Sequence, residues 1–363
     1  MKFFKTGKTT AVSNVTWGLI LIALLAIAVR LWGLNYDLPY IYHPDEPGYI
    51  VRSQSIFKTG DLNPHFFNYP SFMFYLNALA YVPYYAAGKL AGVFGAPSDI
   101  LPPTSLAMGV TYAPMPTAVL LNRLVTLVFG VGVVLVTFGA GRRLTGSTAV
   151  ALLASLFVAI SPTNVLNSRQ VTPDTFVTFW VIVGFYGAIL IYKQGETRHY
   201  LLAGIGVGLA AASKYNGGLI ILAVVAAHLL RHGKASLKQP RIYFALLTSG
   251  LAFLIASPYV LLDYSKFMTD FLFEAEHYAT GHAGMEGDTL NWYIGYLWKT
   301  TGPVLLLAAS IILWAFFHRS KEIILLSVFP ASYFLFISRF PVRNDRTILP
   351  LTPFLFLLAA EAL

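Results

Sequence analysis

Long apolar segments recur along the whole chain, from Trp17 to the C-terminus. A helix needs about 20 apolar residues to cross a bilayer, and it satisfies its own backbone hydrogen bonds there. Only 11% of the residues are charged, against roughly 25% in soluble domains. We therefore predict an all-α, polytopic membrane protein that forms a single domain over residues 1–363. The chain has no cysteine, which excludes disulfides and thiolate metal sites.

The apolar segments predict about ten transmembrane helices, with a first external loop over 35–116 and a second over 263–290. Residues 70–94 are also apolar, but a span there would invert the topology of everything that follows. We predict instead an interfacial helix, with its tyrosines at headgroup depth. The predicted spans lie near 17–34, 117–141, 147–163, 174–192, 200–213, 216–230, 242–262, 291–317, 322–338 and 347–363.

Positive charge is concentrated on one predicted face of the membrane, which the positive-inside rule assigns to the cytosol. This face carries only two acids, Glu196 and Glu322. The net charge of +9 is thus mostly a topological signal, and nucleic acid is not a predicted partner. We predict a plasma (inner) membrane protein with its active site on the external or periplasmic side. The inner-face cations are Lys2, Lys5, Lys8, Arg142, Arg143, Lys193, Arg198, Arg231, Lys234, Lys238, Arg241, Arg319 and Lys321.

Two adjacent carboxylates stand out in the first external loop, in the stretch "IYHPDEPGYI". Asp45 could cap a helix that has Glu46 and Pro47 in its first turn. A carboxylate there could also accept the proton of an attacking hydroxyl group. Asp45 and Glu46 are the catalytic candidates. Because neighbouring helical residues point roughly 100° apart, we expect only one of them to face a given substrate.

Several external cations could bind a phosphate leaving group, because guanidinium groups match phosphate oxygens bidentately. The alternative for each is contact with lipid headgroups or snorkelling, the role that we assign to Arg30 and Lys89. The segment "SRFPVRNDR" is notable for three arginines with a single acid. The predicted phosphate-binding candidates are Arg123, Arg169, Lys214, Arg343 and Arg346, and Arg52 is a further substrate-binding candidate.

Two further external segments carry polar candidates. In "NSRQVTPDTF", Asp174 either caps the next helix or contributes to the site. The loop "FEAEHYATGHAGMEGDTLNW" contains His282 and Glu286. His and carboxylate groups suit zinc, but no helical His-x-x-x-His pair is present. We therefore favour acceptor recognition for this loop over a divalent metal, and we predict no metal ligand and no certain cofactor.

The ordered set of motifs resembles the GT-C superfamily of membrane glycosyltransferases, in particular family 39 protein O-mannosyltransferases and bacterial aminoarabinose transferases. An Asp-Glu-x-x-Tyr motif (Asp45, Glu46, Tyr49) is followed by "NYPSFMFYL", "LNRLVTLVFGVGVVLV", "SRQVTPDTFVTFW", "GLAAASKYNGGL" and "RTILPLTPFLFLLAA". The resemblance implies a GT-C fold and transfer of a sugar, with inversion, from a polyprenyl-phosphate donor to an external acceptor. It implies that Asp45 is the general base, and that Asp174 and Lys214 line the donor site.

The chain departs from the aminoarabinose transferases at two places. Gly48 stands where they carry an arginine, and Arg52 would replace it only if the helix presents it correctly. Asn68 and Tyr69 stand where they carry Glu-Lys, which argues against a metal requirement. His65 is the nearest replacement for the missing side chains, with a buried structural histidine as the alternative.

The competing function is a polyprenyl-lipid or sugar transporter, and a third is a noncatalytic scaffold of the same fold. Transporters place ionisable residues near the midplane and show repeated halves, whereas here these residues gather at the outer boundary. The sequence names neither the sugar nor the acceptor, which can be a protein, a lipid or a glycan. The final "LLAAEAL" has no polar tail, which favours a chain cut before further helices or a soluble domain.

Overall fold

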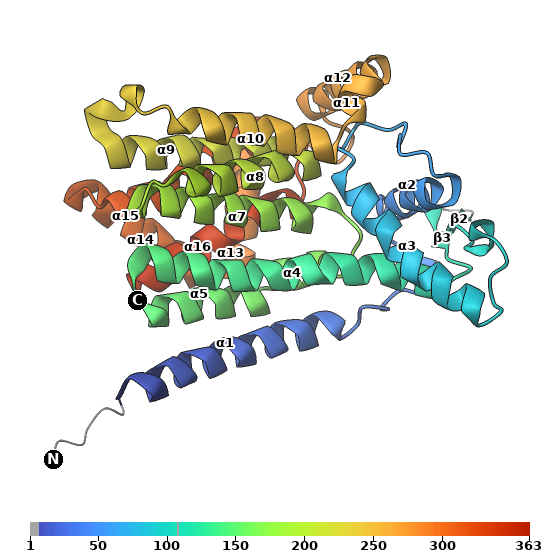
Figure 1. Cartoon of the computed structure of the whole chain (residues 1–363), viewed down its shortest axis with the longest axis horizontal. Coiled ribbons are helices and arrows are strands. Elements are labelled where there is room, and N and C mark those ends of the chain that lie inside the picture. Colours follow the sequence, from blue (N-terminus) through green and yellow to red (C-terminus); the bar gives the residue numbers. More distant parts are fainter. Residues whose placement is uncertain (1–6, 107–108) are drawn as a thin grey trace.

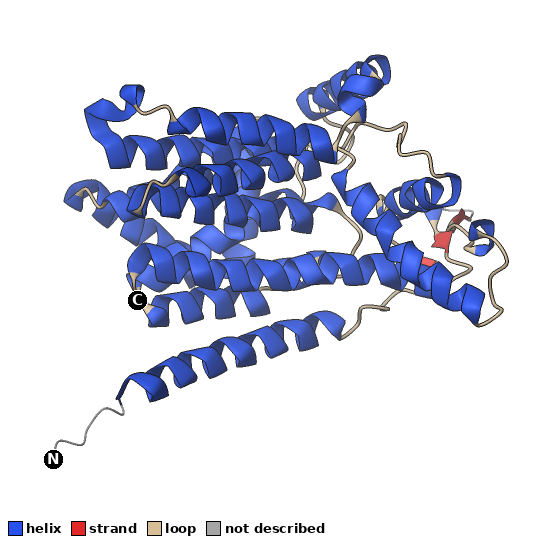
Figure 2. Cartoon of the chain, viewed as in Figure 1, coloured by secondary structure: helices blue, strands red, loops and turns tan. Residues whose placement is uncertain are grey.

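The computed structural model describes residues 7–106 and 109–363, with side chains from Asn14 onward. The inner-face lysines predicted at positions 2, 5 and 8 therefore lie outside the described side chains. The chain folds into a helical bundle with a small lobe at one end (Figures 1 and 2). The bundle contains α1 (Gly7–Leu31), α4 (Pro116–Thr145), α5 (Thr148–Ile160), α6 (Pro162–Asn167), α7 (Pro173–Lys193), α8 (Thr197–Ser213), η3 (Tyr215–Ile220), α9 (Ile221–His232), η4 (Gly233–Lys238), α10 (Arg241–Ala256), α13 (Thr289–Thr301), α14 (Pro303–His318), α15 (Lys321–Ile337), η5 (Arg346–Leu351) and α16 (Thr352–Ala362).

The lobe is built from the first predicted external loop. It contains α2 (Glu46–Thr59), α3 (Phe72–Leu90), η1 (Pro97–Asp99) and a small antiparallel sheet. The sheet has the order β1-β3-β2, with β1 at Tyr40–Ile41, β2 at Thr104–Ser105 and β3 at Thr111–Tyr112. The helices α11 (Tyr259–Leu262) and α12 (Tyr264–Thr280) lie at the same end of the bundle as the lobe (Figure 1). The predicted interfacial helix thus corresponds to α3.

Helix α7 forms the centre of the bundle and packs closely on α8. A Cβ atom at Gly187 would lie 2.6 Å from the Cα of Ala203, and one at Gly206 would lie 2.5 Å from the Cα of Gly184. Small residues at such crossings let the two backbones approach, as is common between membrane helices. Phe185 and Phe354 pack in the same buried core, with ring centroids 4.8 Å apart.

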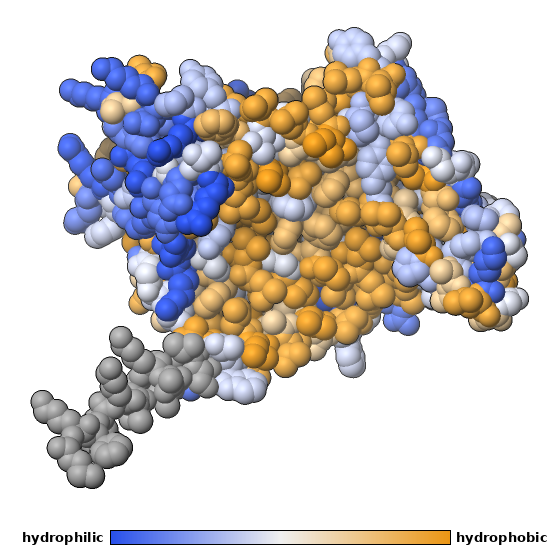
Figure 3. Space-filling view, viewed as in Figure 1, coloured by the Kyte–Doolittle hydropathy of each residue, from blue (hydrophilic) through white to orange (hydrophobic). Residues whose placement is uncertain are grey.

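The two ends of the bundle differ in charge, as the topology prediction requires. The turns α4–α5, α7–α8, α9–α10 and α14–α15 meet at the end opposite the lobe (Figure 1). Hydrophilic residues gather at that end, while an apolar surface covers the middle of the bundle (Figure 3). The cations that these turns bring to one end are Arg142, Arg143, Lys193, Arg198, Lys234, Lys238, Arg319 and Lys321.

Among the described residues, four helical segments are long and apolar enough to cross a membrane: Asn14–Leu31, Pro116–Thr145, Pro173–Lys193 and Tyr215–Lys238. The predicted span over 291–317 is broken into α13 and α14. The chain bends by 113° between α13 and α14. Gly302 adopts a positive φ of 51° there, and Pro303 starts the next helix. A proline disfavours helical backbone at the residue before it, so the break lies at this pair.

Candidate active site

Two cavities meet at the lobe end of the bundle. The first has a volume of about 550 Å³ and is enclosed by the start of α2, the loop before α3, α12 and residues 342–346. The second, of about 460 Å³, lies between η3, α9, α12 and the end of α15, and its walls are mostly apolar. The residues that line both cavities are Asn68, Tyr69, Glu274, Tyr278 and Val342. A polar chamber and an apolar groove thus share a wall.

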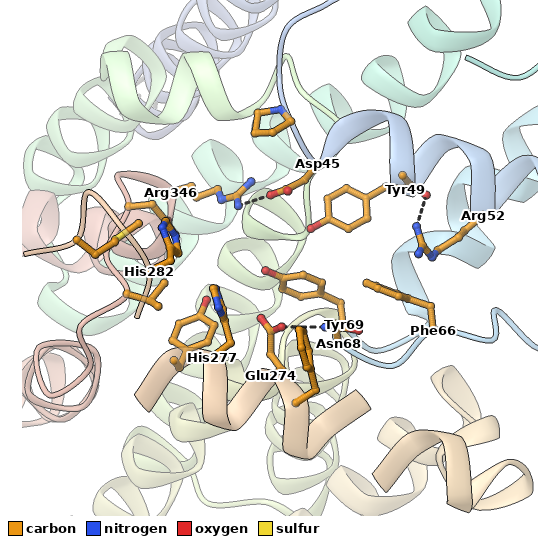
Figure 4. Close-up of a pocket in the computed structure, with 17 residues that line it drawn as sticks. Asp45, Tyr49, Arg52, Phe66, Asn68, Tyr69, Glu274, His277, His282 and Arg346 are labelled. Atoms are coloured by element: carbon orange, nitrogen blue, oxygen red, sulfur yellow. Dashed lines mark hydrogen bonds and ion pairs between the residues drawn. The ribbon is translucent and has the colours of Figure 1, made fainter. Parts of the chain in front are cut away.

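Asp45 lies at the N-terminus of α2 and faces the first cavity (Figure 4). Its carboxylate makes no capping hydrogen bond, although Asp45 occupies the N-cap position. Instead, His43 Nδ1 accepts from the backbone N–H groups of Asp45 and Glu46, both at 3.2 Å. Asp45 is therefore free to form an ion pair with Arg346. Its side chain stays 37% exposed, so a substrate hydroxyl group can reach it.

Glu46 points away from the cavity, as expected for one of two neighbouring helical carboxylates. It is fully buried, and its two oxygens accept from Arg123 Nε and Nη2, each at 2.8 Å. The backbone N–H of Val171 donates a third bond at 3.0 Å. A carboxylate enclosed in this way cannot reach a substrate in the cavity. The assignment of Glu46 as a catalytic residue is corrected to a structural one.

Arg346 lies between two carboxylates, that of Asp45 at the first cavity and that of the buried Asp174. Besides Asp45, it approaches Asp174, with Nε 3.8 Å from Oδ2. Its Nη1 lies 3.1 Å from His43 Nε2. Burial alone would lower the pKa of Arg346, but the charges of Asp174 and Asp45 outweigh it and raise the pKa. Arg346 therefore stays positive beside Asp45.

Lys214 and Asp174 form a buried ion pair beside the second cavity. Lys214 Nζ lies 2.9 Å from Asp174 Oδ1, with side chains 6% and 1% exposed. Burial disfavours the ammonium, but Asp174 raises its pKa well above the ordinary value. Asp174 does not cap α7, because Thr172 occupies the N-cap position. Lys214 lines the groove, so it can hold an anionic group there.

Three other predicted substrate-binding residues, Tyr49, Arg52 and His282, line the first cavity. Arg52 Nη1 donates to the carbonyl of Gly48 at 2.8 Å, and its guanidinium lies 3.8 Å from the ring centre of Phe66. It lies one helical turn beyond Gly48, where its charge faces the chamber (Figure 4). His282 stacks on His277 at 5.4 Å between ring centroids.

Three predicted phosphate ligands lie elsewhere, and these predictions are wrong. Arg123 is fully buried and forms ion pairs with Glu46 and Asp37. Its Nη2 lies 2.8 Å from Asp37 Oδ1. Arg169 donates to the carbonyl of Val29 on α1, away from both cavities. Arg343 is bound by the carbonyl groups of Gly287, at 3.0 Å, and of Glu286. In each case local acceptors hold the guanidinium in place.

Three other expectations also need correction. Glu286 lies outside the cavities, and its carboxylate accepts from Gly284 N–H at 3.0 Å within its own loop. His65 is neither buried nor in the cavity, because it bonds to Asp61 at 3.0 Å with its side chain 64% exposed. Arg30 does not snorkel. It is fully buried and donates to the carbonyl of Ala159 at 2.9 Å.

Sequence reasoning missed several residues in and beside the first cavity. His43, two residues before Asp45, lies beside the cavity and contacts Arg346, and Tyr69, within the quoted Tyr-Pro motif, lines it. Burial raises the pKa of Tyr69, so its hydroxyl stays a neutral donor. Glu274 and His277 lie three residues apart on α12 and therefore share one helix face, a spacing that could have identified them. His43 is held neutral because burial, and then Arg346, lower its pKa.

Among the residues that the structure describes, no three or more His, Asp or Glu side chains lie close enough together to hold a metal ion. The chemistry that the site can support without such a group rests on a carboxylate, fixed cations and tyrosine hydroxyls. Asp45 can take a proton, while Arg346, Arg52 and Lys214 can stabilise negative charge. The apolar groove provides space for a hydrocarbon chain beside these charges.

Comparison with known proteins gives two sequence matches. Residues 104–271 match the family model of dolichyl-phosphate-mannose-protein mannosyltransferases. An uncharacterized protein of Aquifex aeolicus (strain VF5) is 25% identical over 237 residues, which cover 64% of this chain and 47% of that protein. The chain thus spans about half the length of this curated relative.

Solved structures match over nearly the whole chain. ArnT from Cupriavidus metallidurans bound to undecaprenyl phosphate superposes with a TM-score of 0.70 at 17% identity, covering 94% of this chain and 59% of that one. The archaeal oligosaccharyltransferase AglB from Archaeoglobus fulgidus, in complex with an inhibitory peptide and a dolichol-phosphate, gives 0.58 at 12% identity, covering 96% and 50%. These likenesses confirm the predicted multi-pass membrane fold.

Proposed function

We propose that this chain, which has the fold of the GT-C superfamily of membrane glycosyltransferases, transfers a sugar from a polyprenyl-phosphate donor to an acceptor on the outer side of the membrane. The observation that carries this proposal is the junction of the two cavities. A polar chamber with Asp45 shares five wall residues with an apolar groove, and Lys214 is buried at the groove wall. A lipid-phosphate-sugar has the same order of parts: an apolar tail, an anionic linkage and a polar head.

The donor would lie across this junction. Its hydrocarbon tail would occupy the groove beside Phe271 and Phe336. Its phosphate would lie near Lys214 and the hydroxyl of Tyr69, since a fixed cation and a neutral donor both stabilise phosphate oxygens. The sugar would then enter the chamber between Tyr49 and Asp45. Fixed binding of both ends brings C1 within reach of the acceptor, which supplies part of the rate enhancement.

The chemical step is a single displacement with inversion at the anomeric carbon. Asp45 accepts the proton of the acceptor hydroxyl group as its oxygen forms a bond to C1. The bond from C1 to the phosphate oxygen breaks, and its electron pair stays on the polyprenyl phosphate. Arg346 pairs with Asp45 and holds its carboxylate at the cavity, and Lys214 in the groove wall stabilises the leaving phosphate. The acceptor can be a protein, a lipid or a glycan.

The test uses the purified chain reconstituted in vesicles with undecaprenyl-phosphate glucose labelled in the sugar. Transfer to added acceptors, or slow release of free labelled sugar by water, supports the proposal. Movement of intact labelled lipid between leaflets without cleavage would assign transport instead. Binding of undecaprenyl phosphate with neither cleavage nor movement would leave only a scaffold, and either result would overturn the proposal.

A further inference from the structure

Glu274 is the one charged residue among the five that line both the chamber and the groove. It lies on α12 and points into the cavity from the side opposite Asp45, with the rings of Tyr49 and Tyr69 between the two carboxylates (Figure 4). Under the proposed function, this is the place where the sugar joins the phosphate. A negative charge there restricts which groups the substrate can present.

The position of Glu274 is fixed by a contact between two distant segments. Asn68 Nδ2, in the loop before α3, donates to Glu274 Oε2 at 2.9 Å across 206 residues of sequence. The other oxygen, Oε1, has no hydrogen-bond partner among the described residues of the protein. A carboxylate is an acceptor only, so Oε1 is available for a donor group on a ligand in the chamber.

The phosphate of the donor cannot be the partner of Glu274. Phosphate and carboxylate both carry negative charge and both lack protons to donate, so they repel each other at close range. Lys214 and Arg346, by contrast, carry positive charge on other walls of the site. The group that faces Glu274 must therefore be a hydroxyl or amino group on the sugar ring.

We propose that Glu274 is a specificity-determining residue for the sugar of the donor. It accepts hydrogen bonds from hydroxyl or amino groups, and it excludes acidic sugars such as uronic acids by charge repulsion. This inference rests on the proposed function and adds the substrate class: neutral and amino sugars. Asn68 is a positioning residue that aims the carboxylate into the chamber.

Helix α12 offers a matched control, because Glu276 is exposed on the same helix and lines neither cavity. The experiment compares the wild type with Glu274→Gln and Glu276→Gln. Each protein receives undecaprenyl phosphate bearing glucose, glucosamine or glucuronic acid, and kcat/KM is measured for transfer or hydrolysis. All three donors share one lipid and one phosphate, so differences report on the sugar alone.

We expect the wild type to prefer glucose or glucosamine over glucuronic acid by about 100-fold or more, since a site with a fixed polar partner discriminates strongly. Glu274→Gln should shrink this ratio at least about tenfold, because the amide removes the repelling charge and keeps the shape. Glu276→Gln should keep the wild-type ratio. An unchanged ratio in Glu274→Gln would overturn the inference while leaving the proposed function standing.

A second measurement separates sugar recognition from other roles. The affinity for sugar-free undecaprenyl phosphate should be the same in the wild type and in Glu274→Gln. Tighter binding by about tenfold in the variant would place Glu274 at the phosphate. Equal loss of kcat for all donors, with KM unchanged, would assign it to proton transfer; both results overturn the inference. A wild type that binds no polyprenyl phosphate refutes the proposed function itself, and this inference with it.

Discussion

Asp45 and Glu46 are neighbours in the sequence, and each is paired with an arginine, yet the two ion pairs lie in different environments. The pair of Glu46 with Arg123 is sealed, with both side chains 0% exposed. The pair of Asp45 with Arg346 faces a cavity, with side chains 37% and 16% exposed. The same two chemical groups thus form a buried structural ion pair in one case and an ion pair accessible to a substrate in the other.

The difference follows from the helix that begins between them. Asp45 is the N-cap residue of α2 and Glu46 its first residue, so their side chains leave the backbone in different directions. Because His43 takes over the capping bonds, the carboxylate of Asp45 is not used by the helix. Burial therefore separates a structural charge from a reactive one more clearly than residue type does.

The largest expected effect comes from Asp45→Asn. The amide keeps the size of the side chain and an oxygen that can accept from Arg346, but it cannot take a proton at neutral pH. We expect kcat to fall by about 10²- to 10⁴-fold, with folding and binding of undecaprenyl phosphate unchanged. Turnover is measured with a lipid-linked sugar donor, and folding by size-exclusion chromatography. Near-normal turnover would remove Asp45 from the role of base.

The sealed pair should respond in the opposite way. Glu46→Gln removes one charge and leaves Arg123 buried with only Asp37 as a charged partner, a loss of about 3–5 kcal/mol in unfolding free energy. Unfolding in detergent measures it. The folded fraction of this variant should retain much more activity per molecule than Asp45→Asn. A loss of less than about 1 kcal/mol in Glu46→Gln would contradict a structural role for this ion pair.

Sequence reasoning identified the features that depend on local pattern. The fold class follows from hydrophobic length, and the polarity of the bundle from the positions of lysine and arginine. That only one carboxylate faces the site follows from helix geometry. The break between α13 and α14 was harder to predict from the sequence. Gly302 and Pro303 both favour a break, but the apolar run continues across them.

The partners of the charged residues could not be read from the sequence, because they are distant in the chain. Asp45 and Arg346 are separated by 301 residues, and Arg123 reaches Glu46 across 77. Arg123 and Arg346 look alike as external cations. Which of them meets a buried carboxylate, and which lines a cavity, is decided by packing between helices.

Arg346→Lys tests how the open pair works. Lysine keeps the charge but replaces a planar fork, which touches both Asp45 and Asp174, with a single ammonium. We expect kcat/KM to fall by about 10- to 100-fold, less than for Asp45→Asn, with little change in stability. The comparison variant is Lys214→Arg, which should mainly raise the Kd for undecaprenyl phosphate. Equal effects of both variants on Kd and kcat would contradict separate roles.

A smaller effect is expected from His43→Gln, read as a pH profile. Burial and Arg346 lower the pKa of His43, so the folded protein disfavours its protonated form. The stability from neutral His43 is therefore present above the unfolded pKa of about 6.5 and is lost as the pH falls below it. The facing groups that also titrate or carry charge are Asp45, Glu46, Asp174 and Arg346. Glutamine cannot titrate, so the loss of stability at acidic pH should become smaller. An unchanged loss would show that protonation of His43 does not cause it.

The smallest effect is expected at Arg343, which the sequence placed in the same cluster as Arg346. Its guanidinium is held by carbonyl groups of an exposed loop and does not line the cavity. Arg343→Ala should change stability by no more than about 0.5 kcal/mol and leave kcat/KM within about twofold. Because both arginines belong to one short segment, a loss at Arg343 as large as that of Arg346→Lys would mean that the whole segment, rather than the open ion pair, controls the reaction. Parallel assays of the two variants decide between these explanations.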